Sequence, residues 1–381
     1  MFELSEEQDA LKAAAAEAAA AILGQTLKDD DESETFRPEY LHALGEAGLC
    51  GVQSPEEFGG LGLGYSEYAI TLEEIARVSA SYGVSVAVTG LPQVILATFG
   101  TQAQKDAFLP SLVAGETIGA FALSEPDSGS DAASLQSTAV REGDHYRLNG
   151  TKFWITHGGV ADLYVVMART GGSGPKGVSA FLVPGDTPGL EFGKKEEKMG
   201  LRASPTVEVI MKDVVIPADN LLGQEGDGFK VAMSALDSGR ITIGAISVGI
   251  AQAALDTAAA YACQRKQFNK PIIDFQGVGF MLADMACKIE SSRLLVHKAA
   301  SLRDAGKPYS HIAAMAKCVA TDTAIHVATD AVQVLGGYGY TREYPVERYM
   351  RDAKVMQIVE GTNQVQRLVI SRHLRRVYGD Q

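Results

Sequence analysis

Apolar residues change their spacing twice along the 381 residues of this chain, and the two changes limit the folds open to it. Residues 1–118 place apolar side chains at helical spacing, interrupted by glycine and proline. Residues 119–228 instead form short runs rich in Val, Ile, Tyr, Phe and Thr, separated by turn sequences. Residues 229–381 return to long helical patterns with short connections. We therefore predict an α+β fold of three domains: an N-terminal α domain, a middle antiparallel β-sandwich or barrel, and a C-terminal domain like a four-helix bundle.

The charge of the chain argues against a nucleic-acid partner. Its 34 Lys and Arg against 47 Asp and Glu give a formal net charge of −13, whereas phosphate contacts need clustered basic residues. Much of the acidity lies in residues 1–35, where a solvated helix and loop is the simplest interpretation. No uncharged apolar run approaches the ~20 residues of a membrane span, and the first residues lack a basic or Arg/Ser-rich targeting pattern. We expect a soluble, cytoplasmic protein without a membrane partner.

Metal and dinucleotide motifs are absent or misplaced. The four cysteines lack CxxC spacing and indicate a reducing compartment. Three of them fall on helical patterns that predict buried free thiols: Cys263, Cys287 and Cys318. Residues 172–177 fit GxGxxG but lie between predicted strands, so a hairpin loop is favoured over a nucleotide site. Glu142 and His145 have a di-iron spacing but fall in a β-turn, and the other histidines form no cluster, so we predict no metal.

Three segments combine suitable chemistry with a plainer interpretation. Ala122–Asp131 leaves a strand and offers small residues and hydroxyls to a polar ligand, although an Asx or Ser turn would look the same. Trp154 and Thr156 point to one side of a strand and pair a flat apolar surface with a hydroxyl, although core packing is the ordinary use of a lone Trp. The glycines of residues 333–340 permit close approach of a phosphate or a backbone, or simply separate two helices.

A fourth segment, Val359–Thr362, contains a candidate general base. Gly361 is a suitable C-cap and Thr362 a suitable N-cap, so Glu360 is expected at a helix C-terminus among apolar neighbours. The negative end of the helix and burial both oppose ionisation, and a carboxylate with a raised pKa is a useful base near neutral pH. A solvated surface glutamate is the alternative.

In their order and spacing these segments resemble the signatures of the acyl-CoA dehydrogenase flavoprotein family. One signature looks like Ala122–Asp131, and the other like Gln333-x-x-Gly336-Gly337-x-Gly339, continuing through Glu347 and Arg351-Asp352. The resemblance covers essentially the whole chain, including its α, β, α order. Two segments look most like the short-chain and short branched-chain members: Leu236–Ile241 and Arg367–Ile370.

The resemblance implies FAD-dependent oxidation of a short-chain acyl-CoA, straight, branched or cyclic, to the trans-2-enoyl-CoA. Glu360 would remove the α-proton while the β-hydrogen leaves as hydride to flavin N5. The flavin ribityl 2′-hydroxyl and the N–H of Glu360 would polarise the thioester carbonyl. One branch of the family draws its base from the position of Gly239, where glycine cannot serve. Electrons would pass to electron-transfer flavoprotein, and cofactor contacts across subunits imply a homotetramer.

The same resemblance assigns the binding residues. On the flavin side it assigns Phe121, Leu123, Ser124, Gly129, Ser130, Trp154, Ile155 and Thr156. From a neighbouring subunit it assigns Arg265, Gln267, Phe268, Gln276, Gln333, Gly336 and Gly337 to the adenine–pyrophosphate part, with Thr362 and Gln364 closing the site. Position 267 is often threonine in the family, so Gln267 departs from the pattern. To the CoA ester it assigns Ser130, Asp237, Arg240 and Gly361.

Val359 is a second departure, because several straight-chain members carry tyrosine before the base. The smaller side chain is hypothesised to widen the pocket for a branched or cyclic short acyl group.

Competing functions are an acyl-CoA oxidase that passes electrons to oxygen and a flavin-binding, DNA-associated relative that is not a dehydrogenase. The net charge argues against the latter. Nitroalkane-oxidase-like relatives use aspartate as base and desulfinase-type relatives lack the base, so Glu360 counts against both.

Overall fold

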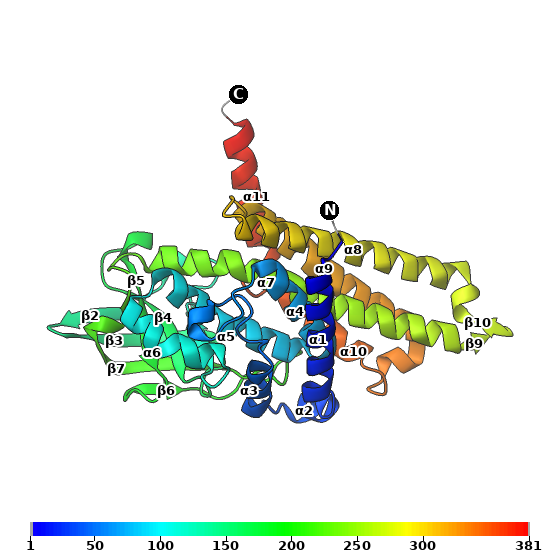
Figure 1. Cartoon of the computed structure of the whole chain (residues 1–381), viewed down its shortest axis with the longest axis horizontal. Helices are drawn as coiled ribbons and strands as arrows, with labels where there is room; N and C mark the ends of the chain where they lie inside the picture. The colour runs from blue at the N-terminus through cyan, green and yellow to red at the C-terminus, as the bar shows by residue number, and fades with distance from the viewer. Residues whose placement is uncertain (1–2, 380–381) are drawn as a thin grey trace.

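The computed structural model describes residues 3–379 and arranges them in the predicted order of helices, sheet and helices (Figure 1). Residues 1–2 and 380–381, at the ends of the predicted terminal domains, lie outside the described residues. The N-terminal helices are α1 (Glu6–Leu23), α2 (Leu27–Ser33), α3 (Pro38–Glu46), α4 (Tyr65–Val78), α5 (Ala80–Phe99) and α6 (Gln102–Val113). Reciprocal capping boxes fix two of the starts, because Ser5 and Gln8 satisfy each other's backbone N–H at α1, and Thr101 and Gln104 do so at α6.

The middle region is built on one sheet that is mostly antiparallel. Its strands are β1 (Gly119–Ala122), β2 (Thr138–Glu142), β3 (His145–Thr156), β4 (Leu163–Arg169), β5 (Val178–Pro184), β6 (Leu190–Phe192), β7 (Thr206–Pro217) and β8 (Leu221–Leu222). They follow the order β6-β7-β3-β2-β4-β5-β8, with β1 paired parallel to β4. The long strands β3 and β7 pair antiparallel, and a bulge interrupts their register between Lys152 and Ile155. This bulge contains Trp154, whose φ is 61°.

Long helices form the C-terminal region. They are α7 (Gly228–Gln264), α8 (Gln276–Asp304), α9 (Ser310–Leu335), α10 (Val346–Met356) and α11 (Asn363–Tyr378), and a hairpin of β9 (Lys266–Gln267) and β10 (Lys270–Pro271) joins α7 to α8. In Figure 1, α7 starts beside the sheet on the left and runs to the β9–β10 hairpin on the far right, with α8 and α9 packed along it. At 1.5 Å per residue, α7 is about 55 Å long and connects the two ends of the molecule.

Two helices are more apolar than the sequence analysis expected. An 18-residue window with a mean hydropathy of 1.4 occurs in α5 and another in α7, so both helices are long and apolar enough to cross a membrane. The expectation that no such run exists is therefore wrong. Within the protein, 72% of the α5 window and 78% of the α7 window are buried. Packing against neighbouring helices and the sheet accounts for this apolar character.

The prediction of buried thiols is wrong for Cys263 and Cys287, which are exposed, whereas Cys318 is buried. In the same helical turns Ala262 and Met285 hold the buried positions. Successive residues of a helix point in different directions, so these two positions carry their thiols outward. All four cysteines are free.

The acidic N-terminal segment is only partly solvated, because Asp30 is buried beside Arg37 and Asp31 pairs with a distant part of the chain. Asp30 in α2 is 2% exposed. Asp31 accepts from Arg351 of α10 at 2.7 Å, and the neighbouring Asp352 accepts the N–H of Leu201 at 2.7 Å. Burial raises the pKa of Asp352 to about 6. We call Asp31, Leu201, Arg351 and Asp352 the domain clasp, because they join the N-terminal helices, the loop before β7 and the C-terminal helices.

Candidate active site

Glu360 lies in the connection between α10 and α11, and not at a helix C-terminus as predicted. Helix α10 ends at Met356, and the apolar residues Ile358 and Val359, which continue the helical pattern in sequence, lie in turns and bends instead. Thr362 is the N-cap of α11, as predicted. Gly361 is not a C-cap; it shares a left-handed backbone with Glu360, with φ of 85° and 55° respectively. The helix dipole therefore does not explain the chemistry of Glu360.

Hydrogen bonds from two helices hold this left-handed turn. A positive φ at a residue with a side chain is uncommon and persists where neighbouring groups enforce it. Gln366 of α11 donates from Nε2 to the carbonyl of Glu360 at 3.2 Å and to that of Gly361 at 2.7 Å. Lys317 of α9 donates from Nζ to the same Gly361 carbonyl at 3.0 Å. The turn presents the Glu360 side chain to α7.

The Glu360 carboxylate packs against Gly239 of α7. A Cβ atom at Gly239 would lie 2.9 Å from Cδ of Glu360 and closer still to its Oε2, so glycine is needed to leave room for the carboxylate. Oε2 is buried and has no hydrogen-bond partner among residues 3–379. A buried carboxylate oxygen without a donor is typical of a group that meets its partner in a bound molecule.

Two buried cationic side chains face this carboxylate. Burial raises the pKa of Glu360 to about 7, while the positive charges of Arg240 and Lys317 act against the rise. Arg240 is 5% exposed and pairs with Asp237 one turn earlier on α7. Lys317 is fully buried, and burial lowers its pKa to about 8. The arrangement therefore supplies a base that titrates near neutral pH, as the sequence analysis predicted for Glu360, but through burial alone.

The loop after β1 is held in place by a buried ion pair. Lys152 of β3 donates from Nζ to Glu125 Oε1 at 2.7 Å and to the carbonyl of Leu123 at 3.1 Å. Glu125 also accepts the N–H groups of Gln136 and Ser137 at 2.5 and 2.9 Å. Although burial opposes ionisation, Lys152 and these N–H groups lower the pKa of Glu125 below its ordinary value. These bonds to Leu123 and Glu125 fix the backbone on both sides of Ser124.

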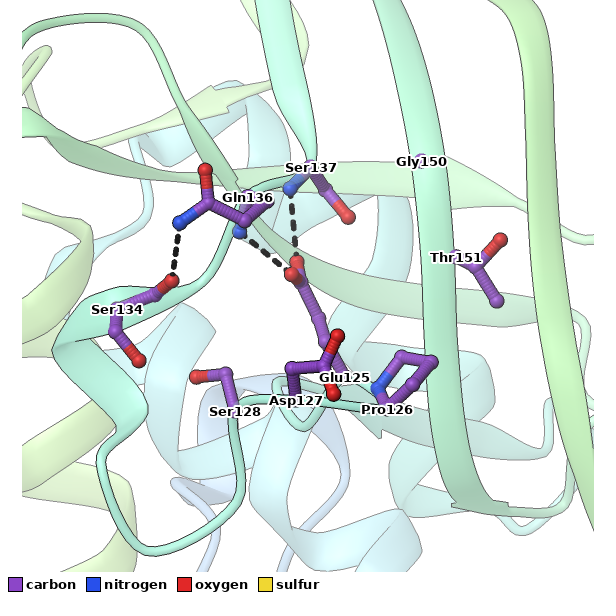
Figure 2. A pocket seen from close by; sticks show the side chains of 9 residues that line it. All are labelled: Glu125, Pro126, Asp127, Ser128, Ser134, Gln136, Ser137, Gly150 and Thr151. Carbon is purple, nitrogen blue, oxygen red and sulfur yellow. Dashed lines mark hydrogen bonds between the residues drawn. The ribbon is translucent and has the colours of Figure 1, made fainter.

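A hollow of about 380 Å³ lies beside this loop (Figure 2). It is lined by Glu125, Pro126, Asp127, Ser128, Ser134, Gln136, Ser137, Gly150 and Thr151. In Figure 2 dashed bonds run from the backbone N–H groups of Gln136 and Ser137 to the Glu125 carboxylate, and another runs from the Gln136 side chain to the carbonyl of Ser134. Residues of the Ala122–Asp131 segment line the hollow, but none of the individually predicted cofactor, substrate or catalytic residues does.

Trp154 does not pack in the core, so the plainer interpretation of the lone tryptophan is wrong. Its side chain is 61% exposed, whereas Ile155 is buried and Thr156 is half-buried. The N–H of Phe153 donates to the carbonyl of Ser124 at 2.9 Å. This bond brings the β1 loop and the Trp154 segment side by side, as a shared binding site requires.

The other residues assigned by the resemblance fall into two groups. One group surrounds the end of β1: Phe121 and Leu123, with Gly129 and Ser130 exposed in the loop that follows. Gln364 is exposed in the first turn of α11. The second group lies at the far end of α7 and consists of Arg265, Gln267, Phe268, Gln276, Gln333, Gly336 and Gly337. Between Gly239 and Arg265 α7 advances about 39 Å, so one chain does not bring the two groups together.

Lys152, Glu125 and Lys317 were not among the residues predicted from sequence, although a signal is present for each of the two lysines. Lys152 belongs to the strand register of Leu148, four residues earlier, whose side chain is buried. Lys317 lies in the helical stripe of Ala313, Ala320 and Ala324, all of which are fully buried. In both cases a lysine at a buried position of the pattern is the signal.

Comparison with known proteins agrees with this architecture. Three sequence models match in succession: the acyl-CoA dehydrogenase N-terminal domain over residues 5–116, the middle domain over 120–214 and the C-terminal domain over 226–375. A short-chain specific acyl-CoA dehydrogenase of Clostridium acetobutylicum is 45% identical over 97% of this chain and 98% of the relative.

Solved structures are equally similar. Butyryl-CoA dehydrogenase from Megasphaera elsdenii superposes with a TM-score of 0.96 at 44% identity, covering 98% of this chain and 99% of that one. A chain of a structure described as the electron transferring flavoprotein of Acidaminococcus fermentans gives a TM-score of 0.97 at 48% identity, covering 99% and 100%. The predicted three-part fold is thereby confirmed, and the chain belongs to the acyl-CoA dehydrogenase family of oxidoreductases.

Proposed function

We propose that the protein oxidises a short-chain acyl-CoA to the trans-2-enoyl-CoA, with Glu360 as the base and FAD as the cofactor. The short-chain class is supported by the C. acetobutylicum relative and by the M. elsdenii butyryl-CoA dehydrogenase. The observation that carries the proposal is the buried, unpartnered Oε2 of Glu360, held against Gly239 by a left-handed turn.

The chemistry of the turn suits removal of a weakly acidic α-proton. A carboxylate with a pKa of about 7 is a stronger base than an ordinary one and is still substantially ionised near neutral pH. Among residues 3–379 the N–H of Glu360 makes no backbone hydrogen bond, so it is available to a thioester oxygen on which negative charge develops. The base and the hydrogen-bond donor to the thioester oxygen would thus both belong to Glu360.

The residues present fit FAD. Bound FAD would accept the β-hydrogen as hydride at N5. Trp154 offers an exposed flat surface, and the half-buried Thr156 places a hydroxyl two residues along the strand. A Cβ atom at Gly129 or Gly336 would meet nothing within 4 Å, so the backbone there is open to a polar ligand. Arg265, exposed at the far end of α7, suits a pyrophosphate.

The separation of the two groups of FAD residues supports an oligomer. Because about 39 Å of α7 divide Gly239 from Arg265, the flavin end and the adenine end of one FAD would contact different chains. We therefore propose that the site is completed by a neighbouring subunit, in a homotetramer. The strongly exposed Phe268, with 88% of its surface free in the single chain, supports burial against a partner.

The proposed electron acceptor is electron-transfer flavoprotein. The structural similarity to a chain described with the electron transferring flavoprotein of A. fermentans supports it. An oxidase would instead pass the electrons to oxygen. Turnover of butyryl-CoA with purified electron-transfer flavoprotein under argon, compared with turnover in air without it, separates the two.

Substitution of Glu360 by Gln tests the function directly. The variant is expected to bind FAD as the wild-type protein does, because the amide fills the same space. Its anaerobic flavin reduction by butyryl-CoA should fall by about 10²–10⁴-fold, the usual contribution of a general base. Stopped-flow bleaching of the flavin measures the rate.

Glu46→Gln is the matched control, since Glu46 is exposed at the end of α3 and does not belong to the helices that hold the turn. It should reduce its flavin at the wild-type rate. Wild-type reduction in Glu360→Gln would remove Glu360 from the role of base, and absence of any reduction by butyryl-CoA in the unmodified protein would remove the short-chain substrate.

A further inference from the structure

Lys317 is a buried cation, and no ion pair in the described part of the chain explains its burial. Its side chain is 0% exposed within α9. Among residues 3–379 no carboxylate lies within 4.0 Å of its Nζ, which instead donates to the carbonyl of Gly361 and to Oδ1 of Asn363, each at 3.0 Å. A buried ammonium without a paired carboxylate is strongly disfavoured, so its retention calls for another reason.

Both acceptors of Lys317 belong to the connection that carries Glu360. Gly361 follows the base and shares its left-handed backbone, and Asn363 begins α11. Asn363 is itself buried and donates to Oγ1 of Thr321 at 2.9 Å and to Oδ1 of Asp322 at 2.7 Å. Lys317 therefore ties the turn to α9 at the point where its conformation is least favourable.

We propose that Lys317 is a positioning residue for the reaction: it holds the turn that carries Glu360 and, through its charge, keeps the carboxylate ionised while the α-proton is removed. The inference rests on the proposed role of Glu360 as base. Lys317 acts through the turn and its charge and is not itself placed in contact with the reacting atoms.

Two cations oppose the rise in the pKa of Glu360, Arg240 more strongly and Lys317 second. From α7 the carboxylate faces Arg240, whose charge is already paired with Asp237. From α9 it faces Lys317, whose charge has no paired carboxylate within residues 3–379, and α11 contributes the neutral Gln366. Burial lowers the pKa of Lys317, and among the charges that oppose this change the Glu360 carboxylate is the largest, ahead of Cys318 and Asp322.

Two neutral variants test the proposal. Lys317→Gln keeps a donor for the Gly361 carbonyl but removes the charge, and Lys317→Met removes both. Without the cation the protonated form of Glu360 is favoured. The acid limb of the pH profile of kcat/KM should therefore move to higher pH by about 0.5–1 unit in both variants. In Lys317→Arg, which keeps the charge, the acid limb should stay at the wild-type position.

Thr321→Val is the matched control, because it cuts a bond to Asn363 in the same network without changing charge. Its acid limb should also stay at the wild-type position. Equal shifts in Thr321→Val and Lys317→Gln would assign the effect to packing and overturn the proposal. If both neutral variants kept the acid limb at the wild-type pH, the proposal would also be overturned. The same holds if neither variant folds as an FAD-containing protein, because Lys317 would then serve only the fold.

A second readout follows proton removal alone. Acetyl-CoA has α-hydrogens but no β-carbon that could lose a hydride, so its deuterium uptake in D₂O, measured by mass spectrometry, reports the base. Lys317→Gln should exchange several-fold more slowly than wild type at about pH 6 and at a similar rate at about pH 9, where the carboxylate is ionised in both. Glu360→Gln should not exchange at either pH. If Glu360→Gln does exchange, Glu360 is not the base. If Glu360→Gln does not exchange but Lys317→Gln exchanges as the wild-type protein does, Glu360 remains the proposed base and Lys317 has no positioning role.

Discussion

Replacing Gly239 by alanine should separate catalysis from stability, because the added methyl group points at Glu360, the proposed base. Its Cβ would lie 2.9 Å from Cδ of Glu360, against the 3.4–4 Å of ordinary contact. The carboxylate would therefore have to withdraw by up to ~1 Å, and a displacement of that size costs roughly 10²-fold in rate. Alanine also exceeds glycine in helix propensity by about 1 kcal/mol, so α7 itself should not be weakened. The expected variant is folded and yellow but reduces its flavin about 10²-fold more slowly.

Anaerobic stopped-flow reduction by butyryl-CoA and thermal unfolding of the same sample measure the two effects. Gly244→Ala is the control, because it adds the same methyl group to the same helix but directs it at Cγ2 of Val296, 2.9 Å away. That variant should reduce its flavin at the wild-type rate. Wild-type flavin reduction in Gly239→Ala would refute the position of the Glu360 carboxylate, and a fall in both variants would place the effect in helix packing.

Three further changes test other parts of the molecule. Val359→Tyr should lower the ratio of kcat/KM for isobutyryl-CoA over butyryl-CoA by about tenfold, the effect of overpacking by ~1–3 kcal/mol, and an unchanged ratio would remove Val359 from substrate choice. Lys152→Met leaves the Glu125 carboxylate buried without its cation, which typically costs ~3–5 kcal/mol, so the melting temperature and the FAD content per chain should both fall. Unchanged FAD content would contradict the proposal that this ion pair holds the loop after β1 in place for FAD. Asp352 has a folded-state pKa of about 6, above its ordinary value, so the stability it contributes is fully present when the carboxyl is protonated and is lost as pH rises through 6. As pH rises from ~4 to ~7, the melting temperature of Asp352→Asn should therefore increase relative to that of the wild-type protein. A constant difference between the two melting temperatures across that range would refute a raised pKa for Asp352.

Local chemistry made much of the fold predictable. The capping box of Ser5 and Gln8 and the N-cap at Thr362 fix helix starts within a few residues of sequence, so the helices they begin were found. Helix ends are less well marked, and α10 stops at Met356 although apolar residues continue the pattern. The raised pKa of Glu360 agrees with the prediction, but only one of the two predicted causes applies. Burial raises this pKa, whereas no helix C-terminus lies at Glu360.

Long-range contacts explain most of what the sequence did not reveal. Asp31 pairs with Arg351 across 320 residues, so no local pattern distinguishes it from a solvated acid. The burial of Lys152 depends on how β3 lies against the β1 loop, which the order of strands alone does not specify. The family signatures located the candidate site as a set of segments, and folding was needed to bring Gly239 against Glu360.

The domain clasp has a consequence for synthesis of the protein on the ribosome. Asp31 is made 320 residues before Arg351, which at 5–20 residues per second amounts to roughly 15–60 s. Throughout that interval the N-terminal helices exist without the guanidinium that pairs with α2, so the clasp forms only as the last helices emerge. Completion of the native structure is therefore tied to completion of the chain, and a nascent chain stalled before α10 should be more readily digested in α2 than the released protein.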